Sequence, residues 1–132
     1  AGKILFVHNN FLNRDDIATL KASGRFSDMY FCLCPKANLY IEGRLPDVPM
    51  MIQAECKIVL GTDSLASNNG LSLVDEITTL LEHYPELDAA QLFQCATANG
   101  AELFNWSDLG SFEKDKKPGV VLVDGASSKR LA

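Results

Sequence analysis

Hydrophobic residues in this chain fall into two patterns that follow one another. Three short runs, at residues 3–8, 29–34 and 57–61, are apolar almost throughout. Continuous runs of this length are typical of strands that are covered on both faces, as in a parallel sheet. We therefore expect three strands at these positions.

Between and after these runs, the spacing of apolar residues changes to that of helices. Asn13 is expected to cap a helix that ends near Gly24, with the carboxylate of Asp16 completing a variant of the capping box. Pro35 ends the second run, and the segment 36–47 after it is expected to be a long loop. Further helices are expected from 46 or 47 to 54, from 71 to 83, and from 88 to 98 with a continuation over 101–104.

The order of strand and helix, repeated three times, predicts βαβ units with right-handed crossovers and a parallel sheet. Two α/β architectures fit this order: an open, doubly wound sheet, or a stretch of a (β/α)8 barrel. The run GVVLVDG at 119–125 lies between glycines and leaves the alternation. We interpret it as a strand of a separate small sheet, or as a piece of one.

Composition narrows the possible functions. The chain has 132 residues, 47% of them hydrophobic, which suits one domain with a substantial core. Its 17 acidic and 12 basic residues give a net charge of -5, and without a basic cluster a nucleic-acid partner is not expected. No apolar run reaches the length of about 20 residues that spans a bilayer. The four cysteines show no CxxC spacing and indicate reduced thiols in a cytoplasmic protein.

Two polar residues whose side chains can take part in catalysis follow the first and third runs. His8 closes the first run, and Asp63 comes directly after Gly61 and Thr62 at the end of the third. Taken alone, Asp63 is most simply a turn or helix-cap acid, and His8 a packing residue. In parallel α/β folds, however, the carboxyl ends of the strands carry the functional groups.

Three stretches change this interpretation: VHNNFLNRDDI (7–17), CPKANLYIEG (34–43) and LGTDSLASNN (60–69). In this order and spacing they resemble the amidohydrolase superfamily, in particular its cytosine deaminase and chlorohydrolase-like branch, and QCATANGAELF (94–104) extends the likeness. Ala37 and Asp115 depart from the residues that are usual in the family. The family's His-x-His and His-x-x-Glu motifs have no counterpart here.

The resemblance implies a fold class and a division of the chain. Residues 1–108 correspond to the C-terminal portion of a (β/α)8 TIM barrel, with strands six to eight and their helices. Residues 109–132 correspond to the segment that returns toward the family's small flanking β-domain. The chain is therefore expected to be a C-terminal fragment of such an enzyme.

The resemblance also implies a chemistry, the hydrolysis of a non-peptide C–N bond with a divalent metal, zinc or iron. Asp63 is implied as metal ligand and base, His8 as the group beside the substrate, and Ser64, Asn68 and Asn38 as further substrate contacts. The substrate is expected to be a small nucleobase-like amine. Catalytic zinc sites use three or more protein ligands, so the isolated chain is expected to bind metal weakly and to be inactive.

A different class of function stays open at this point. Three strands without the rest of a barrel leave open edges and an uncovered sheet face. The alternative is therefore a non-catalytic α/β interaction module that associates with itself. In either case, a homo-oligomer or a missing N-terminal half is the expected protein partner.

Overall fold

A parallel sheet organises the structure. The computed structural model describes residues 2–124 and 127–131, with the side chains of 2–124 and 131. Three strands, β1 (Ile4–Val7), β2 (Met29–Leu33) and β3 (Lys57–Leu60), pair in parallel in the order β1-β2-β3. The three strands predicted from the apolar runs are confirmed, each within one residue of the expected ends.

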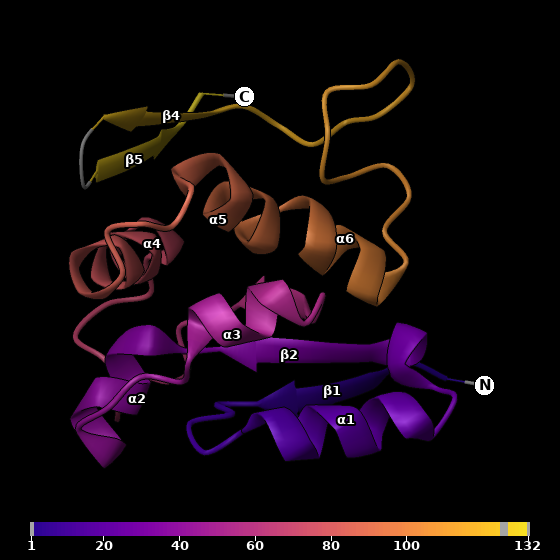
Figure 1. The fold of residues 1–132 in the computed structure, drawn as a ribbon. Helices are drawn as coiled ribbons and strands as arrows, with labels where there is room; N and C mark the ends of the chain where they lie inside the picture. Colours follow the sequence, from indigo (N-terminus) through magenta and orange to yellow (C-terminus); the bar gives the residue numbers. More distant parts are fainter. Residues whose placement is uncertain (1, 125–126, 132) are drawn as a thin grey trace.

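Helices connect these strands and continue after the third (Figure 1). Their bounds are α1 (Arg14–Ala22), a 3-10 turn (Phe26–Asp28), α2 (Pro35–Glu42), α3 (Val48–Gln53), α4 (Leu73–His83), α5 (Ala89–Ala96) and α6 (Ala98–Phe104). The helices expected near 14–24, 47–54, 71–83 and 88–98 are confirmed in place. Within the described residues, every helix is too short or too polar to cross a membrane.

The start of α1 shows how directly the sequence sets a helix end. The Asn13 side chain accepts hydrogen bonds from the backbone N–H groups of Asp15 and Asp16, at 2.9 and 3.0 Å, and the Asp16 carboxylate accepts from the Asn13 N–H at 3.0 Å. These bonds satisfy amides that have no partner inside the helix. The predicted capping box is confirmed.

The main core lies on one face of the sheet. Phe31 and Leu33 of β2 and Ile58 of β3 pack there against apolar side chains of α1, α3, α4 and α5. The helical members of this core are Ile17, Val48, Met50, Met51, Ile77, Leu80, Leu92 and Cys95. Because side chains alternate along a strand, the neighbours of Phe31 and Leu33 point to the opposite face, where α6 covers only part of the sheet.

Residues 36–47 are not a long loop as predicted. Pro35 opens α2, and Gly43 ends it with a left-handed φ of 65°. Proline fits the first helical position because no intrahelical hydrogen bond needs its missing N–H, and glycine takes a positive φ without steric cost. The prediction treated Pro35 only as the end of a strand.

The predicted helix over 88–98 with its continuation is two helices. The backbone breaks at Thr97 (φ -130°, ψ -84°), whereas Gly100, expected at the break, lies inside α6. The break turns α6 toward the amino ends of the strands, where Leu103 packs on Tyr30 and Val59. Packing on the sheet, rather than the glycine, sets the position of the break.

A polar cluster holds α6 in this place. The Glu102 carboxylate accepts hydrogen bonds from the Tyr30 hydroxyl at 2.6 Å and from the Lys57 ammonium at 2.8 Å, and Lys3 donates to the Glu102 backbone carbonyl and to Asn105. The ammonium of Lys57 and the hydroxyl of Tyr30 hold the pKa of Glu102 below its ordinary value. The cluster therefore joins all three strands to α6.

This cluster predicts a dependence of stability on pH. Because the pKa of Glu102 is lower in the folded state, its contribution is present above the unfolded-state pKa and is lost as the pH falls through the folded-state pKa. Its side chain is 54% exposed, so the contribution is expected to stay below about 1 kcal/mol. Urea unfolding should show Glu102→Gln destabilised at neutral pH and equal to the parent in acid. The exposed Glu82→Gln on α4 serves as control, and an equal loss at both pH values would contradict the prediction.

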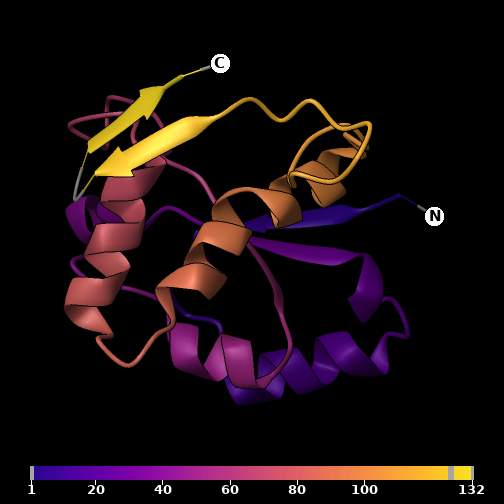
Figure 2. The same cartoon turned by 90° about the horizontal axis from the view of Figure 1, so that it is seen from above.

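The end of the chain forms a second sheet. Strands β4 (Val121–Asp124) and β5 (Ser127–Arg130) pair in antiparallel fashion and lie apart from the parallel sheet (Figure 2). The expected separate small sheet is confirmed, although β5 was not predicted and Gly125 of the expected strand lies outside the described residues. The division of the chain at residue 108 stays a prediction.

Candidate functional site

Both residues singled out from the sequence lie just beyond strand ends. The strand ladder continues by one residue, with the His8 N–H donating to the Cys32 carbonyl and the Gly61 N–H to the Leu33 carbonyl, each at 2.9 Å. His8 follows β1, and Asp63 lies two residues past Gly61. Since β1 and β3 both run parallel to β2, these ends share one edge of the sheet.

The backbone at this edge is unusual. His8, Asn9 and Asp63 have positive φ angles of 70°, 61° and 58°. Residues other than glycine rarely adopt this left-handed conformation, which costs of order 1 kcal/mol or more each and tends to occur at functional sites. The chain thus turns sharply just after β1 and β3, and these turns set the directions of the His8 and Asp63 side chains.

Asn38 holds the imidazole of His8. The Asn38 Nδ2 donates to the His8 backbone carbonyl at 3.4 Å, so its Oδ1 faces the ring and lies 2.8 Å from Nδ1. An amide oxygen can only accept, and therefore Nδ1 carries the proton. The other ring nitrogen, Nε2, makes no hydrogen bond within the part of the chain that the structure describes.

Asp63 is an exposed carboxylate that the structure keeps ionised. The Ser67 hydroxyl donates to Oδ2 at 2.7 Å. This bond is the main cause that lowers the pKa of Asp63; desolvation opposes it, and the Ser64 backbone N–H and the charge of His8 add to it. An ionised carboxylate at this edge can accept a proton or bind a cation.

His8 and Asp63 are neighbours across the middle strand. Two strand spacings of about 4.8 Å separate their backbones by roughly 10 Å. Asp63 also acts electrostatically on Cys32 and Cys34, at the carboxyl end of the strand between them. The expectation that His8 and Asp63 emerge at the same end of the sheet is confirmed, and the function of each residue stays a proposal.

The structure gives the other candidate residues different surroundings. Asn38 is 1% exposed and Asn68 is 9% exposed, and each amide is already hydrogen-bonded within the protein. The Asn68 Nδ2 donates to the Thr62 carbonyl at 2.8 Å, and the Asn68 Oδ1 accepts from the Gly70 N–H at 3.3 Å. Ser64 is exposed beside Asp63. Of these three residues, only Ser64 is exposed enough to contact a substrate.

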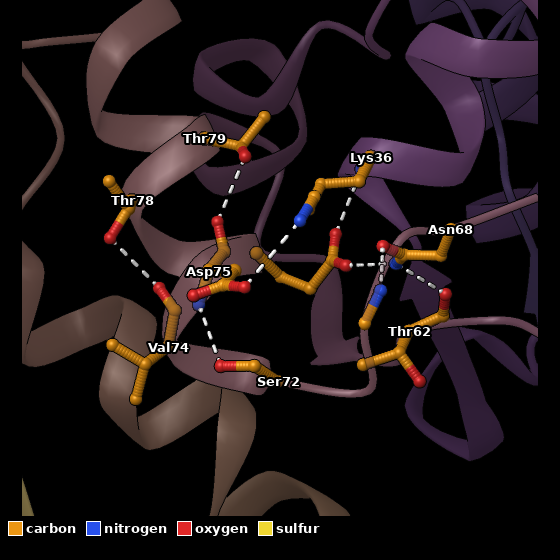
Figure 3. Close-up of polar contacts among 10 residues, drawn as sticks. Lys36, Thr62, Asn68, Ser72, Val74, Asp75, Thr78 and Thr79 are labelled. Carbon is orange, nitrogen blue, oxygen red and sulfur yellow. Dashed lines mark hydrogen bonds and ion pairs between the residues drawn. The ribbon is translucent and has the colours of Figure 1, made fainter. Parts of the chain in front are cut away.

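One residue at this edge was not singled out from the sequence. Glu76 of α4 is 0% exposed, and its carboxylate accepts from the Lys36 backbone N–H at 2.8 Å and from the Asn68 Nδ2 at 2.6 Å. Burial raises the pKa of Glu76, while these two bonds oppose the rise. In Figure 3 the Lys36 side chain points toward Asp75, and the Asn68 side chain lies beside Thr62. In the sequence, the pair Asp75-Glu76 is typical of a helix first turn, so no local signal marks Glu76.

Two open hollows flank this edge. One of about 460 Å³ lies beside His8 and Asn38, with Phe11 and Ile41 among its walls. The other, about 400 Å³, lies between α2 and the loop that contains Ser67. Asp63 lines neither hollow. Open hollows therefore lie on the His8 side and on the Ser67 side of this edge.

The metal implied by the resemblance can be tested against these donors. Among the described residues, no group of three or more His, Cys, Asp and Glu side chains is arranged to hold a metal ion. Asp63 is exposed and has a lowered pKa, so it could hold an ion through one carboxylate oxygen. The described residues are thus suited to supply one ligand of a metal site, but they do not form a complete site.

Sequence comparison places these features in a family. A sequence model described as "Amidohydrolase family" matches residues 1–132. The 5-methylthioadenosine/S-adenosylhomocysteine deaminase of Clostridium tetani is 31% identical over 130 residues, which cover 92% of this chain and 29% of the relative. The deaminase of the same name from Halalkalibacterium halodurans is 35% identical over 97 residues, 68% of this chain and 22% of the relative.

Solved structures agree with the sequence matches. A zinc-bound adenosine deaminase from Xanthomonas campestris superposes with a TM-score of 0.74 at 28% identity and covers 89% of this chain and 28% of that structure. An aminofutalosine deaminase from Helicobacter pylori gives 0.71 at 27% identity, covering 87% and 29%. The expected fold class, part of a (β/α)8 barrel, is confirmed. The chain spans less than a third of these relatives.

Proposed function

The chain belongs to the amidohydrolase family, and from this premise we propose that it is the part of a metal-dependent deaminase that carries the general base. The substrate class is a small ring compound with an amine on a ring carbon, such as a nucleobase or nucleoside. The relatives that match over most of this chain are nucleoside deaminases by name, which supports this class. The observation that carries the proposal is the shared edge at which the ionised Asp63 and the oriented His8 emerge.

Asp63 is proposed to act as proton acceptor and as one metal ligand. Asp63 is ionised at neutral pH, the form that both roles need, and the Ser67 hydroxyl lowers its pKa further. The remaining ligands would come from barrel segments outside these residues. A bound zinc or iron ion would lower the pKa of a bound water to about 7. Asp63 takes one proton of the attacking water and passes it to the departing amine as the C–N bond breaks, so that ammonia leaves. The second proton of the water ends on the neighbouring ring nitrogen, and a ring carbonyl forms.

His8 is proposed to orient the attacking water beside the carbon that is attacked, with Nε2 accepting a hydrogen bond from that water. Its Nδ1–H is occupied by Asn38, so Nε2 is the nitrogen that faces a ligand. A fixed tautomer means that no reorganisation is needed when charge develops on the substrate. Asn38 thus acts through His8. Asn68 is likewise proposed to act indirectly, because its amide orders the loop that carries Asp63. Ser64 is proposed to contact the substrate.

Asn38→Ala is expected to loosen the ring of His8. Loss of one net hydrogen bond, about 1 kcal/mol, corresponds to a shift of roughly fivefold in the ratio of the two neutral tautomers. Nitrogen NMR of the imidazole measures this ratio directly. The control is Asn69→Ala, at an exposed asparagine that follows Asn68. An unchanged ratio in Asn38→Ala would contradict the role that we assign to Asn38.

A chimera tests the proposed reaction. Residues 1–132 replace the matched 130-residue region of the C. tetani deaminase, and ammonia release is measured with zinc and adenosine or 5-methylthioadenosine. We expect release from the chimera and none from the isolated chain, which has one ligand instead of three. A folded, zinc-loaded chimera that releases no ammonia from any amine-bearing nucleobase or nucleoside would refute the proposal.

The location and the partners follow from the same proposal. All four cysteines are unpaired, which supports a reducing, cytoplasmic location. Leu5 and Val7 of β1 are 41% and 50% exposed on the partly covered face, where we propose that the rest of the barrel, or a second copy, packs. A purely non-catalytic module is not favoured, because the family match extends over the whole chain.

A further inference from the structure

The side chains of His8 and Asp63 form no hydrogen bond with each other, and each is held by a different segment. His8 is held by Asn38, which lies in α2. Asp63 is held by Ser67, in the loop between β3 and α4. The relation between base and imidazole therefore depends on what fixes α2 against this loop, in addition to the backbone bonds of the sheet.

The buried Glu76 makes that connection. One carboxylate oxygen accepts from the Lys36 N–H, in the first turn of α2, at 2.8 Å. The other oxygen accepts at 2.6 Å from Asn68, whose amide also binds the Thr62 carbonyl, next to Asp63. A second α2–α4 contact, between the Lys36 ammonium and Asp75 at 3.5 Å, lies beside it (Figure 3).

We propose that Glu76 is a positioning residue that sets the placement of His8 relative to Asp63. The inference rests on the proposed function for what those two residues do, and on the hydrogen bonds alone for how they are held. The path runs from His8 through Asn38 and α2 to Glu76, and from Glu76 through Asn68 to the backbone beside Asp63. No other described side chain accepts hydrogen bonds from both α2 and this loop.

The chemistry of the contact requires a carboxylate. Both partners of Glu76 are N–H donors, and Asn68 cannot turn its amide without losing its bonds to Thr62 and Gly70. The α2 N-terminus also has no side-chain cap from its own N-cap residue, Cys34. Glutamine has the same shape but would present an N–H group to one of the two donors. Glu76→Gln therefore removes one link while the volume in the core is kept.

The first test uses the 132-residue chain and amide hydrogen exchange. In Glu76→Gln, exchange is expected to rise about tenfold either at Lys36 or in residues 62–70, at the segment whose bond to the charged acceptor is lost. Amides of β2 should keep their rates. The matched control is Glu82→Gln, the same change at an exposed position of α4. A uniform rise over all amides would show a general loss of stability and would overturn the inference, as would no rise at either segment.

The second readout is His8 itself. If Glu76 acts through α2, Glu76→Gln shifts the His8 tautomer ratio in the same direction as Asn38→Ala, and the double variant shifts it no further. Independent, additive shifts would overturn the inference. A variant that fails to fold is replaced by Asn68→Ala, which breaks the same path on the loop side and is expected to raise exchange in residues 62–70.

Activity separates this inference from the proposed function. In an active chimera, Glu76→Gln is expected to lower kcat by up to about 10²-fold with little change in KM, since misplacement of reacting groups acts on the chemical step. Activity equal to Glu82→Gln would overturn the inference while the proposed function stands. Local exchange and tautomer changes in a chimera without deaminase activity would support the positioning role and refute the proposed reaction.

Discussion

Asp63→Asn is expected to lower kcat of the chimera by about 10³-fold, because general-base catalysis contributes about 10²- to 10⁴-fold and asparagine cannot accept the proton. The amide keeps the shape of the side chain and can still accept from Ser67. Asparagine also tolerates the left-handed backbone of this position, φ 58°. Steady-state ammonia release at saturating substrate measures the effect on the chemical step.

The sequence offers a closely matched control for this substitution. Asp115 is also an exposed aspartate with a positive φ, 70°, and it lies far along the chain in the segment before the second sheet. Asp115→Asn should leave kcat within about twofold of the parent, since isolated surface changes have small effects. Equal activity of the two variants would remove Asp63 from the mechanism and leave the family assignment intact.

Phe31→Ala is expected to lower the free energy of unfolding by about 3 to 5 kcal/mol, the usual cost of an aromatic cavity. Phe31 is 0% exposed in the central strand, and its ring lies 5.4 Å from that of Phe6 and 6.1 Å from that of Phe26, between centroids. Removal of the ring takes away both aromatic contacts and leaves a void that the flanking strands cannot close. Urea unfolding followed by circular dichroism measures the loss.

Phe112 provides the comparison, since the same change there removes a ring that is 80% exposed. Phe112→Ala should change the free energy of unfolding by less than about 0.5 kcal/mol. If Phe31→Ala is equally mild, the packing around β2 does not hold the sheet together. In that case the isolated chain would depend on contacts outside the described residues for its stability.

The two large effects separate function from stability within one short sheet. Phe31 points to the helix-covered face, whereas His8 and Asp63 lie beyond the strand ends, where the backbone turns out of the sheet. Substitutions at the edge are therefore expected to change activity at nearly constant stability. This arrangement lets a barrel keep its core while residues at strand ends provide the chemistry.

The alignment of strands and the edge that carries polar groups were predictable from the sequence. Continuous apolar runs and helical spacing are local signals, and two parallel crossovers leave little choice about which ends come together. The capping box at Asn13 is equally local and was predicted correctly. His8 and Asp63 could be placed at one edge for the same reason, although their roles came only from the resemblance.

Partners far apart in the sequence were decided by the tertiary structure alone. The contact of Glu76 with Lys36 spans 40 residues, and that of Glu102 with Tyr30 spans 72. Neither residue differs locally from an ordinary surface glutamate of a helix. Both carboxylates gain a structural role because folding brings donors within reach, and for Glu76 it also removes water. This depends on the packing of whole elements rather than on neighbouring residues.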